Sequence, residues 1–226
     1  YNAAVWYSDF LEFAAKQGLF KSFATPQAVG KLTNDDDARW DTARINELNE
    51  ILGFYSLGHW YTWQVSVLGL GPVWTSANDT ARAQVGNILA DGHIFGFGLS
   101  EKEHGADIYS TDMIATRSGD GWTATGGKYY IGNGNEAGRV SVFGQFAKDD
   151  PEYPGEYVFF LADTKSPHYK LRKNVVSAQM YVAAFDLEEY PFTRDDILHT
   201  GQAAFDAALA TVNVGSTRSA QCCATA

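Results

Sequence analysis

The sequence contains few cysteines and no long apolar run. Cys222 and Cys223 are the only two cysteines among 226 residues, and as adjacent residues they cannot link distant parts of a fold. This usage predicts a reducing compartment, and we expect a cytoplasmic protein. No segment approaches the roughly 18 consecutive apolar residues of a membrane-spanning helix, because glycine, serine and histidine interrupt even residues 51–63.

Basic residues are scarce as well. The sequence has 17 Lys and Arg against 27 Asp and Glu, which gives a formal net charge of −10. An acidic surface repels nucleic-acid phosphates and anionic lipid headgroups, so we expect no nucleic-acid partner. With 45% apolar residues the chain has the composition of a globular protein. The sequence begins with Tyr1 rather than Met, and we expect it to be a piece of a longer protein.

The first 92 residues carry the apolar spacing of helices. Residues 5–17 place apolar side chains at helical intervals, and Gly18 is a plausible stop. A second helix is expected to begin near Asp35, where capping side chains precede an apolar stripe. That helix should end between residues 53 and 58, where glycines and a serine interrupt the stripe.

Two further helices are expected before the pattern changes. Residues 59–70 are apolar or aromatic on nearly all sides, which is typical of a buried helix. The glycines and the proline within residues 69–72 should end it, because both residue types disfavour a helix interior. The last of these helices should run from the cap Asn78 to about residue 91.

After residue 92 short runs of β-branched and aromatic residues predict strands. We expect strands at residues 93–99, 111–117, 122–125, 128–131, 140–146, 157–162 and 180–185. The glycines within residues 118–121 predict a tight hairpin turn, because glycine accepts the positive φ that such turns need. Helical spacing returns over residues 203–212.

These patterns predict a multidomain α+β chain. We expect an all-α domain over residues 1–92 and a middle domain resembling a β-barrel or sandwich over residues 93–195. Residues 196–226 should be the start of a C-terminal helical domain. The apolar periodicity is lost after Gly215, which indicates a truncation or a change of reading frame.

The densest group of polar residues is the segment FGLSEKEHGAD at residues 97–107. A metal site built from its acidic residues and His104 is disfavoured, because their spacing should make these side chains diverge and no second histidine lies nearby. A nucleophilic Ser100 would need the second glycine of a Gly-x-Ser-x-Gly elbow. The third interpretation is a polar connection that leaves a strand and turns at Gly105. We predict no metal site.

The segment GKYYIGN at residues 127–133 follows the first segment after one hairpin. Together the two resemble the acyl-CoA dehydrogenase family, in which (F/Y)-x-(L/V/M)-(T/S)-E-x-x-x-G-S-D precedes G-x-K-x-(W/Y)-I-(T/S)-N. The order of helices before strands and the strand at residues 159–163 are similar to that family too. The resemblance covers most of the chain and implies the acyl-CoA dehydrogenase-like fold.

The resemblance implies FAD as cofactor. In the family the first motif lies against the polar edge of the flavin ring, and Phe97, Leu99 and Ser100 occupy those positions. In the family the second motif flanks the other side of the ring. Its positions correspond in this sequence to Tyr130, Ile131 and Gly132.

Two positions depart from the family pattern. Gly132 lacks the hydroxyl that the family carries there. Ala106 stands where the family has a serine that contacts the CoA part of the substrate, so we place Ala106 in the substrate site. Both departures bear on what the implied pocket could bind.

The implied reaction is α,β-dehydrogenation of an acyl-CoA, in which a base removes the α-proton and the β-hydrogen leaves as hydride to the flavin. The family's base is a glutamate of a third domain, so we name no catalytic residue here. The resemblance further implies an electron-transfer flavoprotein as acceptor and a homo-oligomeric full-length protein. Two alternatives remain open: an acyl-CoA oxidase or flavin monooxygenase on the same fold, and a non-catalytic, degenerate binding module.

Overall fold

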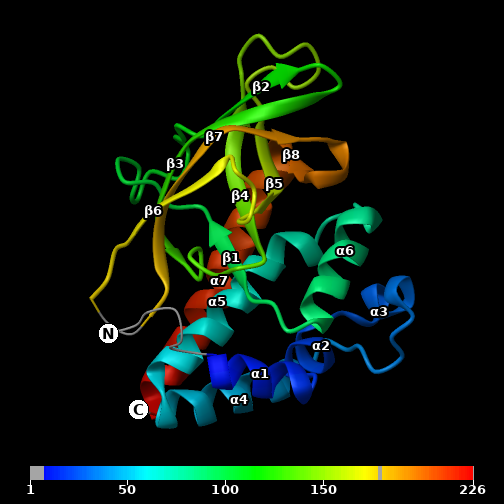
Figure 1. Cartoon of the computed structure of the whole chain (residues 1–226), viewed down its shortest axis with the longest axis vertical. Coiled ribbons are helices and arrows are strands. Elements are labelled where there is room, and N and C mark those ends of the chain that lie inside the picture. The colour runs from blue at the N-terminus through cyan, green and yellow to red at the C-terminus, as the bar shows by residue number, and fades with distance from the viewer. Residues whose placement is uncertain (1–7, 178–179, 226) are drawn as a thin grey trace.

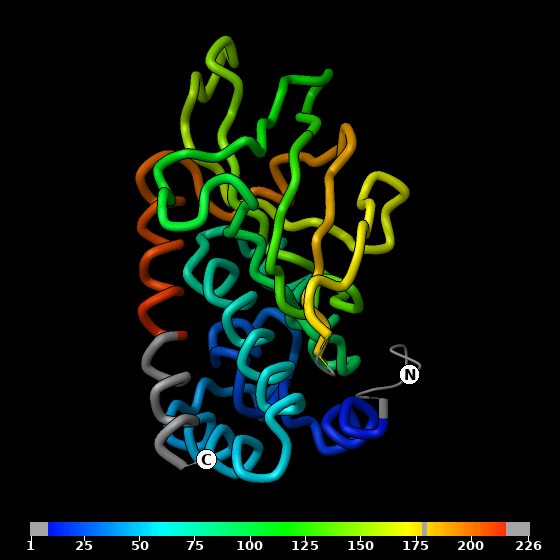
Figure 2. The backbone as a smooth tube through the Cα atoms, turned by 90° about the vertical axis from the view of Figure 1, so that its left-hand side faces the viewer, coloured from blue at the N-terminus to red at the C-terminus, as the bar shows by residue number. Residues whose placement is uncertain are grey.

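A layer of helices lies against one end of a mixed β-sheet (Figure 1). The computed structural model describes residues 8–177 and 180–225. The last helix, α7 (Gly201–Thr225), starts beside the sheet and runs along one side of the molecule toward the other helices (Figure 2). It packs against α4, α5, β5 and β8. This is the α+β arrangement that the sequence predicts.

Six helices precede the first strand in the described part of the chain. They are α1 (Ser8–Lys16), α2 (Leu19–Ala24), α3 (Gln27–Thr33), α4 (Thr42–Tyr55), α5 (Leu57–Trp74) and α6 (Asp79–Ala90). The short α2 and α3 were not expected. Residues 5–7 of the first expected helix lie outside the described residues. Within that part of the chain, no helix is both long enough and apolar enough to cross a membrane.

The start expected for the second long helix is wrong. α4 begins at Thr42 rather than near Asp35, because Asp41 caps it and its carboxylate accepts a hydrogen bond from the backbone N–H of Arg44 at 3.1 Å. The expected cap of α6 is confirmed, since the side chain of Asn78 accepts from Ala81 N–H at 3.0 Å.

The end expected for α5 is also wrong, since the helix continues through Pro72 to Trp74. Gly69 faces the backbone of Gly96, and a Cβ at Gly69 would lie 2.6 Å from the Gly96 carbonyl oxygen. The carbonyl of Gly69 accepts a hydrogen bond from the Ser141 hydroxyl at 2.7 Å. This packing against the sheet outweighs the poor helix propensity of glycine and proline.

The strands form one mixed sheet in the order β6-β7-β3-β2-β4-β5-β8, with β1 pairing in parallel to β4. They are β1 (Phe95–Gly98), β2 (Ile114–Ser118), β3 (Gly121–Gly132), β4 (Arg139–Phe146), β5 (Tyr157–Asp163), β6 (Tyr169–Asn174), β7 (Val182–Phe192) and β8 (Ile197–Thr200). The expected turn between β2 and β3 is confirmed, because Ser118 pairs with Gly121 and Gly119 has a φ of 59°.

Three features of the sheet differ from the expectation. Residues 122–125 and 128–131 belong to one strand, β3, whose pairing with β7 shifts register twice. The strands β6 and β8 were missed, because half of the residues of β6 are charged and β8 has only 4 residues. The apolar alternation of β6 covers only residues 169–172, and β8 is too short to show one clearly.

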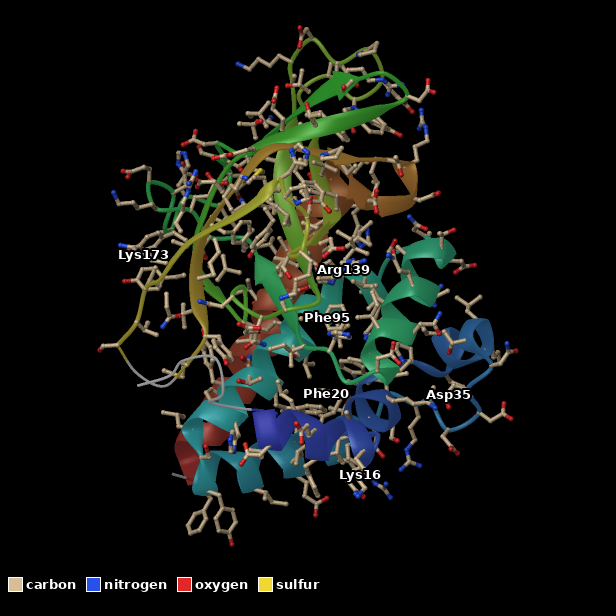
Figure 3. All side chains as sticks on the ribbon, in the orientation of Figure 1. Lys16, Phe20, Asp35, Phe95, Arg139 and Lys173 are labelled. Carbon is tan, nitrogen blue, oxygen red and sulfur yellow. The ribbon has the colours of Figure 1, made fainter. Side chains whose placement is uncertain are left out.

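Asn133 joins α5 to the ends of β1 and β3. The nitrogen of its buried side-chain amide, which carries two hydrogens, lies within hydrogen-bond distance of three acceptors: Thr62 O at 2.9 Å, Phe95 O at 3.0 Å and Ser66 Oγ at 3.2 Å. Phe95 lies at the junction of sheet and helices (Figure 3), and its own N–H donates to Ser66 Oγ at 3.3 Å. One side chain therefore satisfies backbone groups of two elements that are distant in sequence.

We expect Asn133→Ala to lower the free energy of unfolding by about 2–4 kcal/mol, because it removes the buried amide that links Thr62, Ser66 and Phe95. Asn133 also has a φ of 60°, which alanine adopts poorly. Urea unfolding followed by tryptophan fluorescence measures the change. Asn135→Ala is the control, since Asn135 makes a single 3.4 Å contact with Asn174. Equal losses in the two variants would contradict this role of Asn133.

Candidate functional site

A pocket of about 530 Å³ lies between α5, the end of β1, the end of β3 and α7. It brings together five residues of the two motifs: Phe97, Leu99, Ser100, Tyr130 and Gly132. The rest of the lining comes from two helices: Tyr61, Gln64, Val65 and Leu68 of α5, and Val212 and Gly215 of α7. The two motifs are separated in sequence by a complete hairpin, so the fold alone brings them to one cavity.

Two expected site residues lie elsewhere. The side chain of Ile131 is 1% exposed and belongs to the core on the other side of β3. Ala106 is exposed in the loop after β1 and is not part of the described lining. Its neighbours Gly105 and Asp107 line a smaller pocket of about 220 Å³, which shares Leu99 and Ser100 with the larger one. The roles of both residues remain predictions.

The glycine at position 132 has a packing reason. A Cβ at Gly132 would lie 2.7 Å from the Tyr61 hydroxyl and 2.8 Å and 2.9 Å from the two γ-methyl groups of Val65. Real Cβ atoms do not approach other atoms so closely. α5 therefore occupies the space that a larger residue at position 132 would need.

Tyr130 has a strained backbone at the mouth of the pocket. Its φ is 60°, which is uncommon for a residue other than glycine, and it lies where β3 shifts register between Lys128 and Ile131. The ring packs edge-to-face on Tyr129 at 4.8 Å, and the residue is 63% exposed. The irregularity turns Tyr130 out of the strand and places it against the cavity, and such strain is typical of functional sites.

A buried ion pair anchors the segment that forms the pocket's floor. Lys128 Nζ lies 2.6 Å from Glu101 Oε1, and the two side chains are 0% and 5% exposed. Lys128 also donates to Leu99 O at 3.1 Å, and the N–H of Tyr129 donates to Ser100 O at 3.0 Å. These contacts attach residues 99–101 to β3.

Both members of the pair are held in their charged forms at neutral pH. Burial lowers the pKa of Lys128 to about 8, although the charge of Glu101 opposes this shift. Burial raises the pKa of Glu101, but the Lys128 charge and hydrogen bonds from Lys128, Thr111 and Asp112 outweigh it, so the pKa lies below its usual value. The sequence pattern considered for the acidic residues of this segment was a metal site, and it did not pair Glu101 with Lys128. A lysine inside a strand was the available signal.

The chain was compared with family models, curated proteins and solved structures. No family model and no curated protein matches the sequence. Solved structures do match. Acyl-CoA dehydrogenase from Bacillus anthracis, complexed with FAD, gives a TM-score of 0.80 at 17% identity, over 94% of this chain and 35% of that chain. Glutaryl-CoA dehydrogenase from Mycobacterium smegmatis gives 0.76 at 21% identity, over 96% and 55%. Nitroalkane oxidase in complex with spermine gives 0.80 at 15% identity, over 95% and 55%.

The chain has the acyl-CoA dehydrogenase fold. It spans between 35% and 55% of the lengths of these three structures. The similarity in fold confirms the architecture that the two motifs implied. The matching structures are of two dehydrogenases and one oxidase.

Within this acyl-CoA dehydrogenase fold, one expectation about the acidic loop is wrong. The side chains of Glu101 and His104 do not diverge, because ligand atoms of Glu101, His104 and Asp112 lie within 4.8 Å of one another. The strand end and the turn of the loop bring them together. Glu101 Oε1 accepts from Lys128 and Thr111, and Oε2 accepts from Asp112 N–H at 2.7 Å. A cation would therefore compete with the Lys128 ammonium group for Glu101.

The ion pair gives a double-mutant prediction. We expect Glu101→Leu and Lys128→Met each to lower the free energy of unfolding by about 3–5 kcal/mol, because each leaves one buried charge unpaired. The double variant should lose less than the sum of the two, because it leaves no charge. Urea unfolding measures all three. Lys102→Met is the control, since the Lys102–Glu103 pair is 72% and 74% exposed, and we expect no measurable change there. Additive losses would contradict the pairing.

Proposed function

We propose that the protein is an FAD-dependent oxidoreductase whose larger pocket holds the flavin ring. The observation that carries the proposal is that Phe97, Leu99, Ser100, Tyr130 and Gly132, named from two separate motifs, line one cavity. Its volume of about 530 Å³ lies within the roughly 300–1,000 Å³ that is usual for ligand pockets. The Bacillus anthracis structure of the same fold contains FAD, which supports the choice of cofactor.

The chemistry of the pocket fits a flat aromatic ring with one polar edge. Phe97, Leu99 and Val65 supply apolar walls. The hydroxyls of Ser100 and Tyr61 make no hydrogen bond with another residue in the described part of the chain, so both are available to a ligand.

As substrate we propose an acyl thioester, with acyl-CoA as the form that the motifs imply. The smaller pocket adjoins the larger one along Leu99 and Ser100 and reaches the loop that carries Ala106. The carrier part of an acyl thioester, such as CoA, could therefore extend away from the flavin-ring site through the smaller pocket. Bound FAD supplies the two-electron acceptor, while this chain's residues orient the ring and exclude water from it.

The catalytic base that removes the α-proton must come from residues other than those described as lining the larger pocket. No carboxylate is among the described residues that line the larger pocket, and Glu101 is held by Lys128. Removal of an α-proton requires a base within hydrogen-bond reach. We propose that another part of the full-length protein supplies it, that an electron-transfer flavoprotein is the acceptor, and that the full-length protein is a homo-oligomer.

The proposed flavin site predicts that the protein retains FAD. Protein purified with added FAD should keep an oxidised-flavin absorbance band through gel filtration, because the pocket offers apolar walls and free donors. Gly132→Val should retain much less, because its side chain would collide with Tyr61 and Val65 and displace the α5 wall of the pocket. Elution of the wild-type protein without any flavin absorbance would contradict the proposal.

The proposed acyl thioester substrate gives a separate prediction. Anaerobic mixing of the full-length, flavin-loaded protein with acyl-CoAs of several chain lengths should bleach the visible flavin band. Nitroalkanes are the comparison substrates, because nitroalkane oxidase shares the fold. Bleaching by nitroalkanes alone would count against a thioester substrate. Rapid oxygen consumption with peroxide release after reduction would favour an acyl-CoA oxidase over a dehydrogenase.

A further inference from the structure

The residue that fills the space above Gly132 carries a hydroxyl. Tyr61 lies on α5, and its phenol oxygen is 2.7 Å from the position that a Cβ of residue 132 would take. A serine or threonine at position 132 would therefore collide with this phenol oxygen. The motif at residues 127–133 lacks a side-chain hydroxyl at Gly132, and a hydroxyl from another element lies next to that position.

The Tyr61 hydroxyl faces the pocket and is unused by the rest of the chain. Tyr61 lines the larger cavity together with Ser100 and Gly132. Among the described residues, no hydrogen-bond partner of its hydroxyl is found. Burial raises the pKa of Tyr61 to about 12, so the phenol stays protonated in the physiological range and can donate a hydrogen bond.

We propose that Tyr61 donates a hydrogen bond to the ligand ring in this pocket and so supplies from α5 the hydroxyl that position 132 lacks. The inference rests on the proposed function, because it takes the ligand to be the flavin ring of FAD. Tyr61 and Gly132 then form a matched pair: the glycine makes room for the phenol, and the phenol replaces the missing side-chain donor.

A purely structural role for Tyr61 gives a different expectation. A phenylalanine would fill the same volume against Val65 and Gly132 without the oxygen. If Tyr61 serves packing alone, Tyr61→Phe should leave ligand binding unchanged. If the hydroxyl donates to the ring, the same substitution should weaken binding while leaving the fold intact, because it breaks no hydrogen bond to another described residue.

The experiment compares FAD binding by the wild-type protein and by Tyr61→Phe, using quenching of flavin fluorescence and the visible spectrum of the bound flavin. We expect a dissociation constant about three- to tenfold higher for the variant, the effect of one net hydrogen bond, and a shift of the bound-flavin spectrum. Urea unfolding of the two apoproteins should coincide. Tyr129→Phe is the matched control, because Tyr129 lies outside the described lining of this pocket.

A rescue series separates the hydroxyl from the shape of the pocket. Tyr61→Phe and Val65→Ala are combined with either Gly132→Ser or Gly132→Ala, since Val65 also crowds position 132. The serine variant should bind FAD about three- to tenfold more tightly than the alanine variant, because it returns a hydroxyl to the pocket. Equal binding by the two variants would overturn the inference.

The outcomes distinguish this inference from the proposed function. Flavin that binds equally well to the wild-type protein and to Tyr61→Phe overturns the role of Tyr61 and leaves the flavin site standing. A wild-type protein that binds no flavin overturns both. Weakened binding in Tyr61→Phe with restored binding in the serine variant supports both.

Discussion

The close packing of α5 on the sheet is the constraint on which the rest of the molecule depends. Gly69 lies so near the backbone of Gly96 that a single methyl group between them would not fit. Asn133 then ties α5 to the ends of β1 and β3, because the nitrogen of its buried amide lies within hydrogen-bond distance of acceptors on both α5 and β1. These contacts hold the helix against the strand ends, and the helix in turn forms one wall of the cavity beside them.

Two further contacts give that cavity its chemistry. The buried pair of Lys128 and Glu101 attaches the segment after β1 to β3, which fixes Leu99 and Ser100 at the pocket. The register shift in β3 turns Tyr130 outward at the same place. A rigid frame of this kind holds polar groups in position without a cost of ordering them when a ligand binds.

The sequence predicts the order of helices before strands, the turn at residues 118–121 and the motif residues that meet in one pocket, because each leaves a local pattern. It does not predict contacts between distant elements. The continuation of α5 past Pro72 depends on packing against β1, which no local propensity reports. Tyr61 has no motif of its own, and only the missing hydroxyl at Gly132 pointed toward a partner. The partner of Glu101 was hidden for the same reason.

The central claim is that the cavity between α5, β1, β3 and α7 is the flavin-ring site. A crystal structure of the protein with FAD tests it most directly. The ring of FAD should lie inside this cavity, against Phe97 and Leu99, with the hydroxyls of Ser100 and Tyr61 within hydrogen-bond distance of its polar edge. A flavin ring bound elsewhere on the chain, with this cavity left to solvent, would contradict it.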